Sequence, residues 1–156
     1  SGMALRPMAA TVKAQMMQRL FLTAVLVHDY DEAIAFYVNK LDFEVRLDTP
    51  LLESKRWVVL APQGGGHGCI LLAKAETDEQ FNRIGSQTGG RVFLFLDTDN
   101  FDRDYRAYSD RGVNFVEEPR VEDYGTVAVF EDLFGNRWDL IQHNGEFGLG
   151  SPSGQY

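Results

Sequence analysis

The fold is decided by residues 20–37, which read LFLTAVLVHDYDEAIAFY. The first half is rich in Leu, Val and Phe, as in a buried β-strand, and strand alternation places on one face Leu22, Ala24, Leu26 and His28. Asp29 and Glu32 then have the spacing of a helix capping box. Apolar residues recur at helical intervals after it, at Ile34, Tyr37 and Leu41. The stretch therefore predicts a strand that leads directly into an amphipathic helix.

The same order of elements occurs twice along the chain. After the first helix, strands are predicted at residues 43–48, 56–61 and 68–73. About 70 residues after the first strand, a second series begins with a strand at 91–96 and a helix capped by Asp99 or Asn100. Its later strands are predicted at 113–116, 126–131 and 137–142. Two βαβββ modules predict an α+β fold with paired, curved mixed sheets, helices outside, and a site built between the repeats.

The repeat divides the chain into five segments. Ser1–Gly2 before Met3 resembles a cloning remnant, and residues 1–18 are expected to form an N-terminal arm. The remaining segments are a first module at 19–74, a linker with room for a short helix at 75–90, a second module at 91–143 and a flexible tail at 144–156.

Composition excludes several classes of function. The net charge is -8 and the basic residues are scattered, which argues against a nucleic-acid partner. No apolar run approaches the about 18 residues of a membrane span, and no secretory signal is present, so a cytoplasmic protein without a membrane partner is expected. Cys69 is the only cysteine, which rules out an internal disulfide and a cysteine zinc cluster.

Several motifs carry a resemblance to a known family. In chain order they are VHDYDEAIAFY at 27–37, LDFE at 41–44, RGVNF at 111–115, YGTVAVF at 124–130 and DLFGNRWDL at 132–140. This series resembles the vicinal oxygen chelate superfamily, which includes glyoxalase I, bleomycin and fosfomycin resistance proteins and extradiol dioxygenases. The resemblance covers about four-fifths of the chain and implies a glyoxalase-like fold.

The resemblance also implies where a divalent metal would be held. The family's enzymes use four ligands, one from the first and one from the last strand of each module. The matching positions here are Leu22, Leu71 with Cys69 as the alternative, Phe93, and Asp139. Three of them are apolar, and one carboxylate with water molecules binds such metals only weakly. The three histidines lack chelating spacing, so no cofactor is expected, and a divalent metal is the alternative.

The residues at the predicted inter-module face have the composition of a small-molecule pocket, which is apolar with a few polar groups. The candidate lining is Leu22, Trp57, Leu71, Arg91, Phe93, Phe95, Tyr124 and Asp139. The same composition would also suit a filled core, and both interpretations stay open. A buried Asp139 needs a partner, for which Arg91 is the first candidate, whereas Trp138 is expected to face the helices.

Two classes of function remain. The favoured one is a metal-free small-molecule binding protein of the bleomycin-resistance type, whose ligand is partly aromatic. The alternative is a metal-dependent lyase or isomerase resembling lactoylglutathione lyase, or a dioxygenase. No catalytic residue is predicted from the sequence. Because members of the family often dimerise, the resemblance also implies a homodimer.

Overall fold

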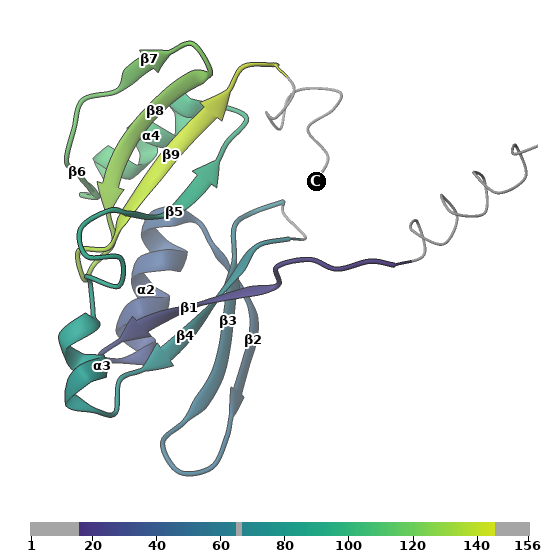
Figure 1. The fold of residues 1–156 in the computed structure, drawn as a ribbon, viewed down its shortest axis with the longest axis vertical. Coiled ribbons are helices and arrows are strands. Elements are labelled where there is room, and N and C mark those ends of the chain that lie inside the picture. Colours follow the sequence, from purple (N-terminus) through teal and green to yellow (C-terminus); the bar gives the residue numbers. More distant parts are fainter. Residues whose placement is uncertain (1–15, 65–66, 146–156) are drawn as a thin grey trace, which may run out of the picture.

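A computed structural model describes residues 16–64 and 67–145 of the chain and contains two mixed sheets (Figure 1). The first sheet has the order β1-β4-β3-β2, with β1 at Leu22–Val27, β2 at Glu44–Pro50, β3 at Arg56–Ala61 and β4 at Cys69–Lys74. The second has the order β5-β9-β8-β6, with β5 at Val92–Asp97, β6 at Asn114–Phe115, β8 at Gly125–Glu131 and β9 at Arg137–His143. A short strand, β7 at Arg120–Glu122, pairs with β8.

Both sheets use the same pairing. In each module the first strand lies parallel to the last one, β1 against β4 and β5 against β9, while the other pairs are antiparallel. Parallel pairing needs a long crossover connection between the two strands. In each module this connection begins with the helix that follows the first strand. The structure therefore confirms the α+β fold and the repeated order of elements.

The helices begin and end where side-chain chemistry allows. Helix α2 (Tyr30–Leu41) starts after Asp29, whose carboxylate accepts from the backbone N–H of Glu32 at 2.9 Å. It ends at Asp42, which adopts a left-handed conformation with φ of 60°. Helix α4 (Phe101–Asp110) is capped by Asn100, which settles the choice between the two predicted caps.

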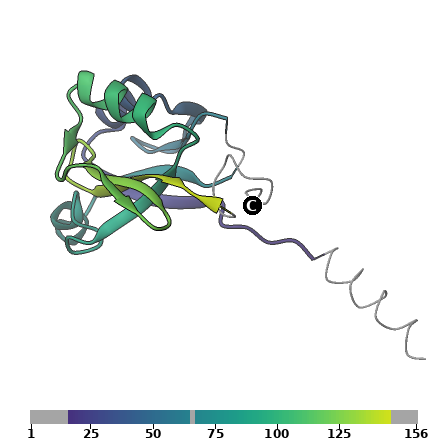
Figure 2. The ribbon, with the colours of Figure 1, turned by 90° about the horizontal axis from the view of Figure 1, so that it is seen from above.

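Helices α2 and α4 lie on the same side of the two sheets, as the view from above shows (Figure 2). One hydrophobic core fills the space beneath them and draws on both modules. At its centre the Tyr37 ring lies 5.5 Å from Phe43 and 5.9 Å from Trp138, measured between ring centroids. The hydroxyl of Tyr37 donates to Asp132 at 2.7 Å. Because Tyr37 and Asp132 belong to different modules, this side of the molecule joins the repeats.

Two elements lie outside the βαβββ repeats: a short helix, for which the predicted linker had room, and a strand that was not predicted. The segment predicted as a linker contains α3 (Asp78–Arg83), which starts with a capping box between Thr77 and Gln80. Strand β7 adds a fifth strand to the second sheet, beyond the four that were predicted. It has only three residues, too few for an alternating pattern to mark it. No helix in the described part of the chain is long and apolar enough to cross a membrane.

Candidate functional site

The face of the first sheet that turns away from the core carries a small apolar cluster of its own. Val59, Ala61 and Cys69 are buried in it, and Leu22 and Leu71 pack against them. Strand pairing explains the grouping, since Leu22 lies opposite Cys69 and Leu71 lies opposite Val59. Trp57 precedes Val58, a residue of the main core, and therefore shares the face of Val59 while remaining 39% exposed. We call Leu22, Trp57, Val59, Ala61, Cys69 and Leu71 the first-sheet patch.

The corresponding face of the second sheet is different in chemistry. Phe95 on β5, Asp139 on β9 and Val129 on β8 lie side by side in register across adjacent strands. The Phe95 ring is 66% exposed, an unusual position for so large an apolar side chain. Val129, by contrast, is buried. We call these three residues the second-sheet patch.

Asp139 is the acid of the second-sheet patch, and its surroundings act on its charge. Partial burial raises the pKa of its carboxyl group, the charge of Arg120 opposes that rise, and the charge of Glu117 adds to it. Its Oδ1 atom is buried and has no hydrogen-bond partner among the described residues. Arg120 donates to Glu117 at 2.9 Å and to Glu122 at 2.6 Å. Its guanidinium is therefore already engaged by two carboxylates.

A polar pair, Asp97 and His143, continues the face of the second-sheet patch toward the end of the sheet. His143 Nδ1 lies 3.1 Å from Asp97 Oδ1, and the Tyr124 ring lies 6.5 Å from the His143 ring. Tyr124 was predicted for the pocket, whereas Asp97 and His143 were not. Both could have been found by extending the predicted strands 91–96 and 137–142 by one residue each. Strand alternation then places Asp97 on the same face as Phe95, and His143 on the same face as Asp139.

Two of the predicted pocket residues lie elsewhere. Phe93 packs against the main core, because the register of β5 shifts between Val92 and Leu94 and breaks the alternation. Arg91 is exposed, and within residues 16–64 and 67–145 no ion pair joins it to Asp139. The predicted Arg91–Asp139 pair is thus not present, and Arg120 is the cation that acts on Asp139. Trp138 is buried in the core, on the helix side, as predicted.

The side chains at the family's ligand positions do not fit a divalent metal. Leu22, Leu71 and Phe93 offer no nitrogen or oxygen donor, and Cys69 is buried among apolar groups. Throughout the described ranges, no three His, Cys, Asp or Glu side chains are grouped so that they could hold a metal ion. Asp139 is therefore a lone acid in this position.

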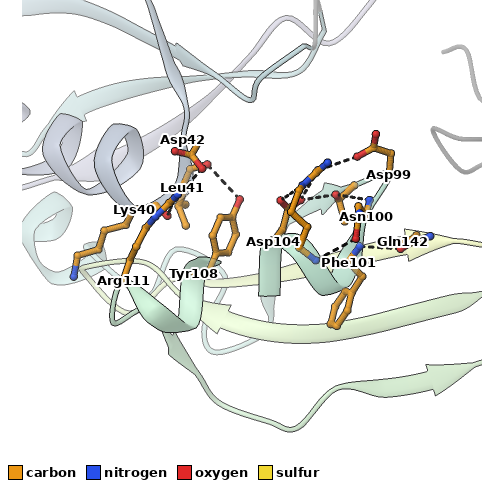
Figure 3. Close-up of polar contacts among 12 residues, drawn as sticks. Lys40, Leu41, Asp42, Asp99, Asn100, Phe101, Asp104, Tyr108, Arg111 and Gln142 are labelled. Atoms are coloured by element: carbon orange, nitrogen blue, oxygen red, sulfur yellow. Dashed lines mark hydrogen bonds and ion pairs between the residues drawn. The ribbon is translucent and has the colours of Figure 1, made fainter. Parts of the chain in front are cut away.

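A groove of about 580 Å³ is lined by none of the eight predicted pocket residues, although Asp97, the partner of His143, contributes to its lining. It runs between the C-terminal end of α2 and helix α4 (Figure 3). There Arg111 donates to Asp42 at 2.7 Å and to the carbonyl of Lys40 at 3.0 Å, and the Tyr108 hydroxyl donates to the carbonyl of Leu41 at 3.3 Å. These contacts join the two modules, so we assign the groove a structural role.

Comparison with known proteins places the chain among relatives of the same fold. A family model described as Glyoxalase/Bleomycin resistance protein/Dioxygenase superfamily matches residues 19–140. An uncharacterized protein of Shewanella frigidimarina (strain NCIMB 400) is 55% identical over 130 residues, covering 83% of this chain and 96% of the relative. The crystal structure of UcmS2 superposes with a TM-score of 0.70 at 31% identity, covering 81% of this chain and 98% of UcmS2. TnmS3, described as an antibiotic binding protein from Streptomyces sp. CB03234, gives a TM-score of 0.69 at 29% identity, covering 82% and 98%.

Proposed function

We propose that this chain, which belongs to the Glyoxalase/Bleomycin resistance protein/Dioxygenase superfamily, is a metal-free protein that binds a small, partly aromatic molecule on the sheet faces opposite helices α2 and α4. The observation that carries this proposal is the second-sheet patch, where an exposed Phe95 ring lies beside a carboxylate with an unpartnered oxygen. Apolar area with a few polar groups that fix orientation is the usual composition of a ligand site.

Two further points support binding over metal-dependent catalysis. Leu22 and Leu71 stand at positions where the family's enzymes hold their metal, and they provide no donor atom. TnmS3, at 29% identity, is described as an antibiotic binding protein. A sequestering role needs only shape, apolar contact and orientation, all of which the two patches offer. A lyase, isomerase or dioxygenase of this family would need a donor set that the patches lack.

The proposed site also exposes apolar side chains that a partner would bury. Phe95 and Trp57 expose 66% and 39% of their surface on the sheet faces opposite helices α2 and α4. Exposed apolar faces of this kind mark surfaces that a partner or ligand buries. We therefore propose a homodimer in which a second copy closes the faces around the ligand. Size-exclusion chromatography with light scattering should give twice the chain mass, and a monomer at high concentration would contradict the dimer.

Metal analysis tests the proposal against its alternative. The protein is purified without chelator, and nickel, zinc, iron and manganese are measured per chain. We expect far less than one metal per chain and no turnover of the hemithioacetal of methylglyoxal and glutathione. Near-stoichiometric metal, or such turnover, would replace the binding role with an enzymatic one.

Ligand binding has an internal reporter in the chain. Trp57 is half-exposed on the first-sheet patch, whereas Trp138 is buried in the core. A ligand between the patches should therefore quench the Trp57 emission and leave that of Trp138 unchanged. The variant Trp57→Phe provides the control, because it keeps an aromatic ring but should remove the ligand-dependent signal.

A further inference from the structure

The two patches differ in charge as well as in shape, and this difference points to a ligand class. The first-sheet patch is uncharged, from Leu22 through Trp57 to Leu71. The second-sheet patch carries the carboxylate of Asp139, with Glu117 and Glu122 nearby. Arg120 is the cation whose charge acts on Asp139, and two glutamates already bind its guanidinium. An anionic ligand would have to compete with both of them.

We propose that the site selects an aromatic molecule that carries a protonated amine, with Asp139 accepting from the ammonium group and Phe95 contacting the ring. The inference rests on the proposed function and names its ligand class. A protonated amine supplies a charged donor to the Asp139 carboxylate, whose buried Oδ1 has no hydrogen-bond partner among the described residues. It would also offset the loss of hydration that makes this carboxylate costly to keep charged.

The geometry sets the spacing between the two groups of the ligand. Phe95 and Asp139 are direct partners on neighbouring parallel strands, and such strands lie about 4.8 Å apart. An amine on a short aliphatic chain can therefore reach Asp139 while its ring packs on Phe95. The exposed ring of Phe95 also offers its face to a cation at little cost in packing.

Two fluorescent probes that share a ring and a linker, one ending in a charged amine and the other in a neutral acetamide, test this inference. Dansylcadaverine carries a naphthalene ring and a free primary amine, and N-acetyldansylcadaverine carries the same ring without the charge. With the full chain, we expect the amine to bind about tenfold more tightly than the acetylated probe, the usual effect of one charge-assisted hydrogen bond. Asp139→Asn should remove that difference and leave the affinity of the acetylated probe unchanged.

Two control variants separate local from general effects. Asp110→Asn makes the same exchange at an exposed residue in the last turn of α4, a helix on the opposite side of the sheets, and should keep the tenfold preference. Phe95→Leu should weaken both probes by a similar factor, because both carry the ring. Circular dichroism confirms that each variant is folded.

The outcomes separate this inference from the proposed function. Saturable binding of both probes with equal affinity, or an amine preference that survives Asp139→Asn, would overturn the ligand class and leave the binding role standing. If neither probe saturates up to about 1 mM, a Kd corresponding to only about 4 kcal/mol, the faces are not a small-molecule site and both ideas fail. Dissociation of a dimer by Asp139→Asn would show that a cation of the second copy occupies the acid, which also overturns the inference.

Discussion

Replacing Tyr37 by Phe removes one oxygen from the contact that joins the two modules. The Tyr37 hydroxyl donates to Asp132 Oδ2 at 2.7 Å, and burial together with the Asp132 charge raises the pKa of Tyr37 well above its usual value, so the hydroxyl stays protonated. Asp132 is only 5% exposed and accepts three other hydrogen bonds, from the backbone N–H groups of Phe134 and Asn136 and from the Asn136 side chain, each at 2.9 Å.

The size of the effect follows from this arrangement. A hydrogen bond to a charged group contributes about 1.5 to 3 kcal/mol to stability. Because Asn136 still donates to the same Oδ2 atom, the carboxylate is not left without a partner, and we expect a loss of about 2 kcal/mol. The ring contacts with Phe43 and Trp138 should persist. For a chain of this length that loss corresponds to a decrease in Tm of about 4 to 8 °C.

Urea unfolding followed by circular dichroism measures this loss directly. The matched control is Tyr105→Phe, which removes a hydroxyl from a partly buried ring that stacks on Phe101 and makes no hydrogen bond within the described residues. It should change the free energy of unfolding by less than about 0.5 kcal/mol. Equal effects of the two substitutions would refute the assignment of Tyr37 and Asp132 as the link between the modules.

Two further predictions concern other contacts. A Cβ at Gly85, which has φ of +78°, would lie 1.9 Å from the carbonyl oxygen of Phe134, whereas at Gly89 it would meet no atom within 4 Å. Gly85→Ala should therefore destabilise the chain by clearly more than the about 1 to 2 kcal/mol of left-handed strain expected for Gly89→Ala, and equal losses in urea unfolding would count against the close approach. The hydrogen bond from Arg56 lowers the pKa of Asp48 in the folded chain. The stabilisation that this pair gives the fold is therefore complete above the ordinary Asp pKa of about 4. It is lost as the pH falls through the lowered pKa of the folded state. The Tm difference between the chain and Asp48→Asn should accordingly be largest near neutral pH and shrink as the pH falls through the lowered pKa of Asp48, and a difference that grows on acidification would contradict this sign.

The sequence predicts best those features that a few neighbouring residues determine. Asp29 caps α2 as predicted, because a helix cap depends only on local hydrogen bonds and backbone geometry. The repeated βαβββ order follows from apolar periodicity, which the burial of whole strands enforces. The faces of Asp139 and Trp138 follow from alternation along a regular strand.

Prediction fails where strand geometry is irregular or where the partner is distant. Alternation would place Phe93 with Phe95, but the register shift in β5 turns Phe93 toward the core. Arg91 matches the parity of Asp139, yet the cation acting on that acid comes from β7, a three-residue strand without a sequence pattern. The pair of Asp97 and His143 was missed because each lies one residue beyond a predicted strand end, and strand ends are the least determined part of any pattern.

The contacts that hold the modules together and the candidate binding residues lie on opposite faces of the sheets. The Tyr37–Asp132 bond and the ring of Trp138 belong to the helix side, where burial is complete. Phe95 is largely exposed, so exchanging it removes little buried surface and should cost little stability. This separation means that the chain can change its ligand preference without losing its fold. It also means that a loss of probe binding in Phe95→Leu or Asp139→Asn, with unfolding free energy unchanged, reports on the site itself.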